Sequence, residues 1–362
     1  MTTQPRESID SLPAYEMADL NIDSDTPVIQ LAQNELALPP SPKAIQAARD
    51  AIPGCNRYSD IDHLALRKAI ADIHGLDASR ILCGAGSLEI MSLIASAYCE
   101  PGTSVVVSQY GYKFFQVLCS AAGASVHVAP EPEKRINIEA MCDAVTADTR
   151  LMVVVNPGNP TGALLASGEL VELRRRLPES VMLIVDGAYA EFVSEDSFDN
   201  GFGLVDSGAN MIVLRTFSKA YGLAGMRTGW CYGAMDIIQS LLKIRCPNSI
   251  SSPALAAAEA AVRDTTFVAA SCREVIELRR KLTTKLKILG LNVLPSAANF
   301  VLFECPEQGP INAASLNLRL RERGFILRPM GSYELPNHLR VTIGSRQEMT
   351  RLAEALDEII HP

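Results

Sequence analysis

The chain has 362 residues, of which 48% are hydrophobic and 20% charged, and its formal net charge is −8. This length exceeds one average domain, so we expect a large domain and a smaller one. The apolar content supports a sizeable core, which excludes a disordered or collagen-like protein. An acidic balance without basic blocks argues against nucleic acid or an anionic membrane as the partner.

The nine cysteines are odd in number and lack CxxC spacing. This pattern predicts reduced thiols, not a disulfide framework or a zinc site. Residues 1–17 lack the basic start and apolar core of a signal peptide, and no apolar stretch approaches the roughly 18 residues that cross a bilayer. We therefore expect a cytoplasmic protein without a metal.

Short apolar runs alternate with helical patterns between residues 50 and 245. Runs that are apolar on both faces are typical of central strands in a sheet covered by helices on both sides. The alternation predicts an α/β domain. The expected strands are 81–83, 104–108, 124–129, 151–155, 181–185 and 211–214.

The pattern changes after residue 251. A long Ala-rich helix is expected over 252–289, and apolar pieces then alternate with helices at about 312–323 and 346–360. This predicts a smaller α+β domain. The first 30 or so residues are expected to form an irregular arm lying on another surface, and no motif accounts for 329–337.

The turn Gly84-Ala85-Gly86-Ser87 joins an expected strand to an expected helix. Backbone N–H groups in such a turn can bind an anion at the helix N-terminus. It is not a dinucleotide fingerprint, because Glu89 replaces the third glycine of GxGxxG. A plain tight turn with Ser87 as N-cap explains this motif equally well.

A proline- and glycine-rich loop, NPGNPTG at 156–162, directly follows the expected strand 151–155. Open α/β sheets bind ligands at the carboxyl ends of their strands. Asn159 offers an amide donor and acceptor there. An Asx-turn would explain one asparagine, but the whole loop is too elaborate for a plain connection.

Asp186 ends the next expected strand, and Tyr189 follows three residues later. A carboxylate after four apolar residues is expected to be partly buried and to need a partner. A structural salt bridge and a functional role remain equally open for Asp186. Tyr189 could share the same cleft.

Lys219 lies between small, hydroxylic and apolar residues after another expected strand. Lysine forms Schiff bases, and desolvation lowers its pKa for that reaction. Thr216, Ser218 and Arg227 supply the donors that bind a phosphate. A solvated lysine is the alternative, which this neighbourhood disfavours.

Competing chemistries lack their signatures, since HExxH and GxSxG are absent. His127 is expected to be structural, whereas His338 near Arg340 could be structural or functional, with the structural role favoured. Taken together, the motifs resemble those of the pyridoxal-phosphate-dependent aminotransferases of fold type I, class I/II. The closest resemblance is to the histidinol-phosphate aminotransferase group. The resemblance runs from Leu12 to Gly344 and is carried by NPGNPTG, the Asp186–Tyr189 segment and the Lys219–Arg227 segment.

The resemblance implies that Lys219 forms the Schiff base with pyridoxal phosphate and then moves the substrate proton. Asp186 would pair with the pyridine nitrogen and keep the ring an electron sink. Asn159 and Tyr189 would hydrogen-bond the phenolic oxygen, and Tyr110 would stack on the ring.

The phosphate would be bound by two backbone amides and by side chains, and Tyr58 would reach the phosphate of a neighbouring subunit. A homodimer is therefore expected. Arg340 would bind the anionic group of the substrate, a carboxylate or a phosphate, since either suits a bidentate guanidinium. The implied phosphate-binding residues are Ala85, Gly86, Thr216, Ser218 and Arg227, and the residues implied beside Arg340 are Arg328, Tyr15 and Asn34.

The resemblance further implies a large domain with a mostly parallel seven-stranded sheet and a small α+β domain. We expect an N-terminal arm at 1–45 packing on the small domain or a partner subunit, the large domain at 46–250 and the small one at 251–362. The chain departs from the group at Gly86-Ser87, where an acidic pair is common, and at Gly187, where the group has glutamate.

These departures leave the substrate open. We expect transfer of an amino group from a glutamate-like donor to a 2-oxo acid or imidazole-acetol phosphate. The alternatives are an aromatic or other amino-acid aminotransferase, a lyase or cyclase that uses the same cofactor, and a non-catalytic binding protein on this fold.

Overall fold

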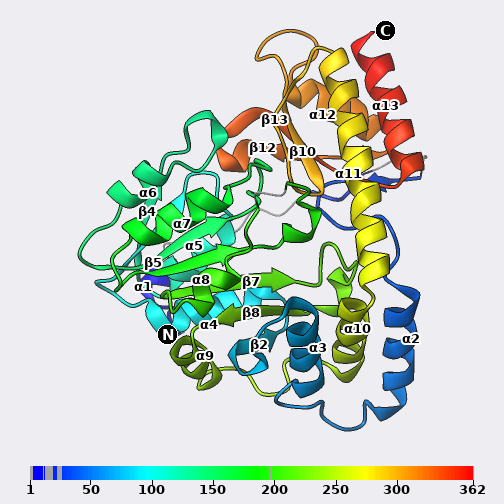
Figure 1. Ribbon diagram of the computed structural model, residues 1–362. Helices are drawn as coiled ribbons and strands as arrows, with labels where there is room; N and C mark the ends of the chain where they lie inside the picture. The colour runs from blue at the N-terminus through cyan, green and yellow to red at the C-terminus, as the bar shows by residue number, and fades with distance from the viewer. Residues whose placement is uncertain (1–2, 11, 13–18, 23–26, 196–197, 362) are drawn as a thin grey trace.

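The computed structural model describes residues 3–10, 12, 19–22, 27–195 and 198–361. Its largest sheet has seven strands, and every neighbouring pair is parallel except the two pairs that include β8. This confirms the predicted fold class (Figure 1). The strand order is β2 (Ile81–Gly84), β8 (Gly229–Gly233), β7 (Met211–Thr216), β6 (Met182–Asp186), β5 (Thr149–Val155), β3 (Ser104–Ser108) and β4 (Ser125–Ala129).

Helices cover both faces of this sheet because its central strands are apolar on both sides. On β5, Leu151 and Val153 pack into one hydrophobic cluster, while Met152 and Val154 pack into another on the opposite face. The first cluster includes α4 (Ser87–Tyr98), α5 (Lys113–Ala121) and α9 (Met235–Leu242). The second includes α3 (Leu64–His74), α6 (Ile138–Asp143), α7 (Ser167–Arg176), α8 (Phe202–Asp206) and α10 (Ser252–Arg263).

A second, antiparallel sheet lies toward the C-terminus, in the order β12 (Arg328–Met330), β13 (Leu335–Thr342), β10 (Phe300–Glu304) and β9 (Asn292–Val293). The helices of this part are α11 (Thr265–Ile288), α12 (Ala313–Glu322) and α13 (Arg346–Ile360). Figure 1 shows α11 running alongside both parts of the molecule. α10 packs against α3 and α2 (Pro42–Ala51), so the chain crosses from one part to the other between α10 and α11.

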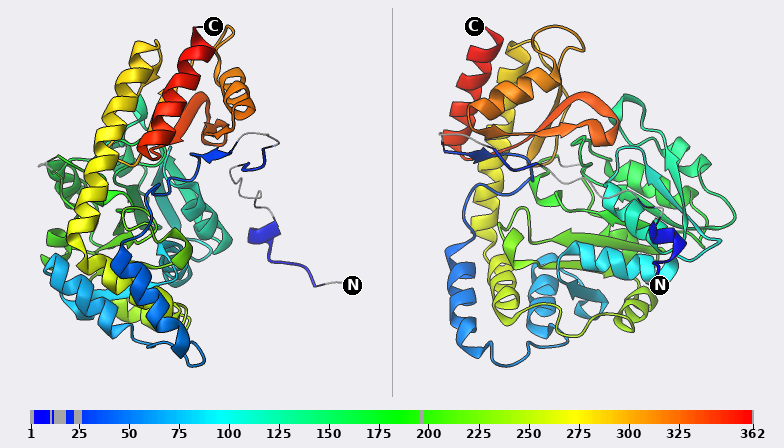
Figure 2. Two further views of the ribbon diagram at one scale, coloured as in Figure 1. Left: turned by 90° about the vertical axis from the view of Figure 1, so that its right-hand side faces the viewer. Right: turned by 180° about the vertical axis from the view of Figure 1, so that it is seen from behind.

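The N-terminal residues contact both parts of the molecule. Ser8 of α1 (Glu7–Asp10) donates to the Ala121 carbonyl at the end of α5. β1 (Ile29–Gln30) pairs in parallel with β11 (Phe325–Ile326), next to the second sheet (Figure 2). The domain boundaries at 45 and 250 stay predictions.

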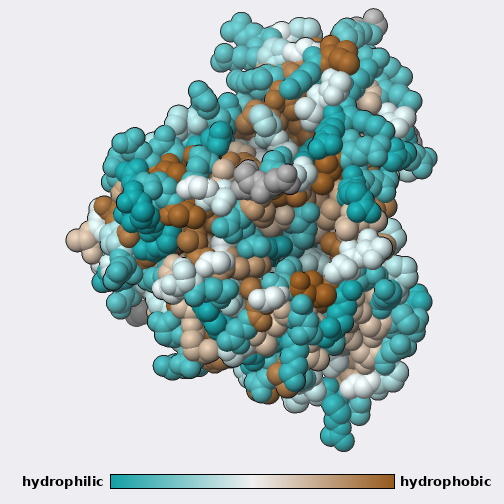
Figure 3. Space-filling view, viewed as in Figure 1, coloured by the Kyte–Doolittle hydropathy of each residue, from teal (hydrophilic) through white to brown (hydrophobic). Residues whose placement is uncertain are grey.

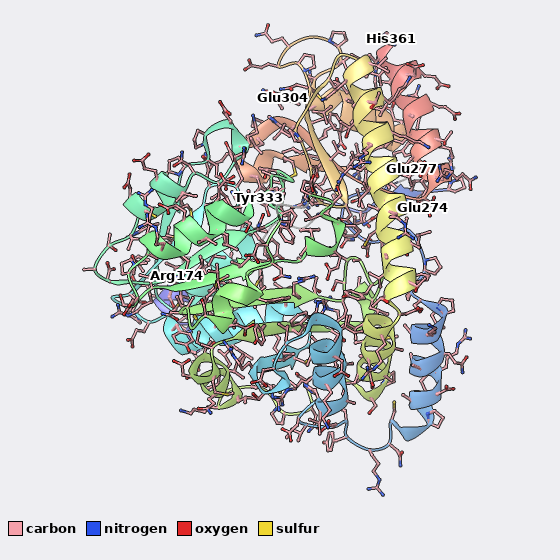
Figure 4. All side chains as sticks on the ribbon, in the orientation of Figure 1. Arg174, Glu274, Glu277, Glu304, Tyr333 and His361 are labelled. Carbon is pink, nitrogen blue, oxygen red and sulfur yellow. The ribbon has the colours of Figure 1, made fainter. Side chains whose placement is uncertain are left out.

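The segment 329–337 forms the end of β12, a 3-10 turn (Gly331–Tyr333) and the start of β13. Tyr333 is buried there in a cluster with Leu302, Met330 and Leu335, against which Tyr110 also packs. This cluster joins the second sheet to the loop after β3. Figure 4 labels Tyr333 where the two parts of the molecule meet.

Within the described residues, no helix is long and apolar enough to span a membrane. The face shown in Figure 3 is largely hydrophilic, with hydrophobic side chains scattered singly or in small groups. That distribution is ordinary for a protein surface in water.

Candidate active site

A cleft of about 450 Å³ opens at the carboxyl ends of three parallel strands, where Val155, Asp186 and Thr216 line it. This is the edge at which open α/β sheets bind ligands. The second sheet closes the opposite side. The predicted site residues that line the cleft are Asn34, Asn159, Asp186, Tyr189, Thr216, Ser218, Lys219, Arg227, Arg328 and Arg340.

Lys219 follows β7 and is partly buried in the cleft. Its Nζ donates a hydrogen bond to the Gln33 carbonyl oxygen at 3.0 Å. Burial and, to a smaller extent, the positive charge of Arg340 lower the pKa of Lys219 to about 8, against the opposing effect of Glu35. The side chain is therefore closer to its neutral, nucleophilic form at physiological pH than an exposed lysine.

Asp186 is the last residue of β6 and is buried. Its Oδ1 accepts the Ala188 N–H at 3.1 Å. Burial raises the pKa of Asp186 to about 6, although that N–H and the nearby Lys219 charge favour the ionised form. Among the described residues no cationic side chain forms a salt bridge with Asp186, which disfavours the structural salt bridge that the sequence left open.

Arg340 lies on β13 opposite Arg328 of β12, so two guanidinium groups line one wall of the cleft. Arg340 donates to Asn159 Oδ1 at 2.5 Å and to the Ala32 carbonyl at 2.7 Å. Its guanidinium also lies 5.3 Å from the Phe300 ring centre. Because the Asn159 amide oxygen faces Arg340, the Asn159 NH₂ group is the part that can donate to a ligand.

Asn34 is buried beside Tyr189, and its Nδ2 donates to the tyrosine oxygen at 2.9 Å. The Asn34 oxygen contacts the Thr342 hydroxyl at 3.3 Å. Tyr189 packs edge-on against Phe300 at 5.2 Å between ring centres. The amide that was predicted to bind substrate is therefore engaged within the protein.

The phosphate end of the predicted site lies at the N-terminus of α4. Arg227 reaches across this end and donates to Ser218 Oγ at 3.2 Å. Thr216 Oγ1 accepts the Ser218 N–H at 3.1 Å, so the hydroxyls are fixed beside the guanidinium. A Cβ added to Gly86 would lie 2.5 Å from Arg227 Nη2, so a larger residue there would displace the guanidinium group.

The two backbone amides predicted to bind phosphate have partners inside the turn, and their binding to phosphate stays a prediction. The Ala85 N–H donates to Glu89 Oε2 at 2.5 Å, and the Gly86 N–H donates to the Gly84 carbonyl at 2.7 Å. Both donors are thus satisfied inside the turn.

Gly86 has a φ of +80° and is the N-cap of α4, so the helix begins at Ser87. The sequence suggested Ser87 as the N-cap, and the structure makes it the first helical residue instead. Ser87 and Leu88 line the cleft instead. The N–H groups of a helix that are left without intrahelical partners are those of its first turn. The N–H groups of Ser87 and Leu88 are therefore further candidates for binding an anion.

The predicted tyrosines are placed in different surroundings. Tyr110 lines a small adjoining cavity with Glu131 and Asn159, whereas Tyr112 lines the main cleft. Stacking of Tyr110 on the ring stays a prediction, and Tyr112 is a second candidate. Tyr58 is 90% exposed and is not among the cleft residues. Tyr15 lies outside the described residues.

Other cleft residues have no counterpart among the predicted ones. Gln33 and Glu35 flank Asn34 in the sequence, and Tyr333 belongs to the segment that no motif explained. The residue types at these three positions did not by themselves predict a place in the site. Their role follows only from the way the N-terminal segment and the second sheet close over the strand ends.

Residues 26–356 match the family described as aminotransferase class I and II. This chain belongs to that family. The histidinol-phosphate aminotransferase of Ruegeria pomeroyi is 40% identical over 352 residues, which cover 97% of this chain and 96% of the relative. That of Paramagnetospirillum magneticum is 39% identical over 357 residues, covering 98% of each chain.

Solved structures agree with this assignment. Histidinol-phosphate aminotransferase from Sinorhizobium meliloti, in complex with pyridoxal-5'-phosphate, superposes with a TM-score of 0.90 at 29% identity and covers 99% of this chain and 98% of that one. A putative histidinol-phosphate aminotransferase from Erwinia carotovora atroseptica gives 0.86 at 30% identity, covering 91% and 95%. The chain is a pyridoxal-phosphate-dependent transaminase of fold type I, as the motifs predicted.

The cleft of this aminotransferase fits the cofactor in three places. Asp186 is a buried carboxylate with room for a cationic ring nitrogen as its partner. Arg227, Ser218 and the start of α4 form a cradle for a phosphate, and a Cβ at Gly86 would fill part of it. Lys219 lines the same cleft as the amine that can bind the aldehyde.

Gly86→Ala should weaken cofactor binding. The new Cβ would displace Arg227, and the left-handed backbone at Gly86 adds strain. We expect the dissociation constant for pyridoxal phosphate to rise about tenfold, or about 1.4 kcal/mol, in an absorbance titration of the apoenzyme. Gly203→Ala is the matched control, because no atom lies within 4 Å of its added Cβ. Equal affinity of both variants for pyridoxal phosphate would contradict phosphate binding at this turn.

Lys219 in the apoenzyme should react as an amine with a pKa near 8, against an ordinary value of 10.5. Since only the neutral amine is nucleophilic, its labelling rate by a small amine-reactive ester should rise with pH and level off above about pH 9. Peptide mass spectrometry at each pH measures this rate, with N-acetyl-lysine amide as reference. A labelling rate of Lys219 that keeps increasing in parallel with that of the reference amine up to pH 10 would contradict the lowered pKa.

Proposed function

We propose that this aminotransferase acts on histidinol phosphate and its oxo partner, imidazole-acetol phosphate, with a glutamate-like amino acid as the second substrate. The observation that carries the proposal is the pair Arg340 and Arg328, which are register partners on neighbouring strands and both line the cleft. Two guanidinium groups suit a doubly charged phosphate. Relatives that are 37–40% identical over nearly the whole chain have the same named activity.

The remaining residues have roles toward the cofactor and the substrate proton. Bound pyridoxal phosphate supplies an electron sink that lets the substrate α-carbon lose a proton. Lys219 binds the cofactor and then carries that proton on Nζ. Asp186 keeps the pyridine nitrogen protonated. The Asn159 NH₂ and the Tyr189 hydroxyl donate to the phenolic oxygen.

The phosphate of the cofactor is bound by the first N–H groups of α4, Ser87 and Leu88, with Ser218 and Arg227 beside them. Thr216 fixes the loop before Lys219 through its bond to the Ser218 N–H. These donors combine a helix N-terminus with a guanidinium, which is a favourable arrangement for a dianion.

The working unit is proposed to be a homodimer. Tyr58 leaves 90% of its surface exposed on a loop away from its own cleft, as expected of a side chain that reaches a neighbouring subunit. Ile52, Ile61 and Leu64 near it are also exposed, which suits an interface. A cytoplasmic location stays a prediction.

Arg340→Lys tests the substrate assignment. Lysine keeps the charge but loses the planar fork that binds both the ligand anion and Asn159. We expect kcat/KM for histidinol phosphate to fall about a hundredfold, or about 2.7 kcal/mol, while the absorbance of the lysine-bound cofactor stays in place. Stopped-flow loss of that absorbance on mixing with substrate measures the half-reaction.

Histidinol without its phosphate is the control substrate, and Arg340→Lys should change its much lower kcat/KM by less. A wild-type enzyme that prefers phenylalanine over histidinol phosphate would instead indicate an aromatic aminotransferase. Release of carbon dioxide or a cyclised product without formation of the pyridoxamine form would indicate a lyase or cyclase.

A further inference from the structure

Three buried side chains form a hydrogen-bonded row from the second sheet to the cofactor side of the cleft. Thr342, Asn34 and Tyr189 are 3%, 1% and 4% exposed. Thr342 Oγ1 contacts Asn34 Oδ1 at 3.3 Å, and Asn34 Nδ2 contacts the Tyr189 hydroxyl at 2.9 Å. Because all three side chains are almost fully buried, the polar atoms that face one another in the row need each other as hydrogen-bond partners.

The direction of each bond in this row follows from the backbone. The Asn34 N–H donates to Thr342 Oγ1 at 2.9 Å, so that oxygen acts as an acceptor there and its single proton remains for Asn34 Oδ1. This arrangement fixes the amide with its oxygen toward Thr342. Its NH₂ group must then face Tyr189 and donate to it.

A phenol has one proton, and the bond from Asn34 uses a lone pair of the Tyr189 oxygen. The proton of Tyr189 is therefore directed away from Asn34. Tyr189 lines the cleft, and Lys219 Nζ lies 5.9 Å from its ring centre. The Tyr189 hydroxyl is thus set up as a donor toward a ligand held by Lys219.

We propose that Asn34 and Thr342 are positioning residues that fix Tyr189 as a hydrogen-bond donor to the phenolic oxygen of the cofactor. This inference rests on the function proposed above for Tyr189. A donor at that oxygen withdraws electron density from it, so the oxygen holds the proton on the neighbouring Lys219 nitrogen less tightly. The row therefore sets the pH at which the lysine-bound cofactor loses this proton.

The residue types at these positions fit the role. Asn34 has a φ of +55°, a left-handed backbone that asparagine tolerates better than most residues. Thr342 and Arg340 are two residues apart on β13 and so point to the same face of the strand. One strand thus carries both the proposed substrate anchor and the start of the row.

Other charges also act on Lys219, and all of them remain in the variants below. Arg340 comes from β13, Arg227 from the phosphate end, Asp186 from β6 and Glu35 from the N-terminal segment. A titration of the resting enzyme therefore needs variants that change the row while leaving these four groups in place.

Asn34→Asp is the sharpest variant, because it keeps the size of the side chain but gives Tyr189 an oxygen that accepts. The carboxylate competes for the Tyr189 proton, so the phenolic oxygen loses its donor. The readout is the pH midpoint of the visible absorbance of the holoenzyme without substrate. We expect this midpoint to rise by about one pH unit.

The added negative charge would also raise the midpoint, so the variant is compared with Tyr189→Phe and the double variant. If Asn34 acts through the Tyr189 proton, Asn34→Asp should raise the midpoint less in the Tyr189→Phe background than in the wild type. We expect less than half of the shift that it causes in the wild type. Fully additive shifts would overturn the inference, because charge alone would then explain them. An unchanged midpoint in Tyr189→Phe would instead overturn the role proposed for Tyr189 itself.

Thr342→Val and Thr342→Ser form a second pair that adds no charge. Valine removes the proton that holds the amide, so Asn34 can turn its oxygen toward Tyr189, and the midpoint should rise. Serine retains the hydroxyl and should restore the wild-type midpoint. Circular dichroism and the thermal midpoint verify folding of each variant. Midpoints equal to wild type in both Asn34→Asp and Thr342→Val would overturn the inference.

Discussion

The active site depends on one short irregular stretch of backbone, residues 31–34, which joins the strand ends of the large sheet to the second sheet. Leu31 bonds to Ile326 and Thr342 through its N–H and carbonyl. The next two carbonyls accept from Arg340 and Lys219, at Ala32 and Gln33 respectively. Asn34 then bonds to Tyr189 and Thr342. Four consecutive residues therefore fix the relative positions of the proposed substrate anchor, the lysine and the tyrosine.

Residues 31–34 can hold these side chains in place because most of the stretch is buried away from water. The same burial that strengthens its hydrogen bonds disfavours charge, which raises the pKa of Asp186 to about 6 and lowers that of Lys219 to about 8. Both groups therefore change charge state closer to neutral pH than they would in water, and a partner in the cleft can shift either of them. A cationic ring nitrogen beside Asp186 offsets the cost of its burial, and an aldehyde consumes the neutral amine of Lys219.

The sequence predicted the parts of this arrangement that have strong local signals. Apolar runs gave six strands of the large sheet, but β8, Gly229–Gly233, was missed because glycine at both ends and one tryptophan obscure its pattern. The lysine, aspartate and asparagine motifs lead to the cleft because each directly follows a strand. The internal hydrogen bonds of the Ala85 and Gly86 N–H groups could not be predicted, since only the folded turn reveals them. The contacts of Asn34 join positions 308 residues apart, which no local pattern encodes.

The central claim is that pyridoxal phosphate is bound covalently to Lys219 in the cleft between the two sheets. Borohydride reduction of the holoenzyme followed by peptide mass mapping tests this claim most directly, because reduction makes the link between lysine and cofactor permanent. The account predicts one phosphopyridoxyl adduct per chain, on Lys219, which glutamate added before reduction diminishes. An adduct on another lysine, or none on a protein that retains the cofactor, would contradict it.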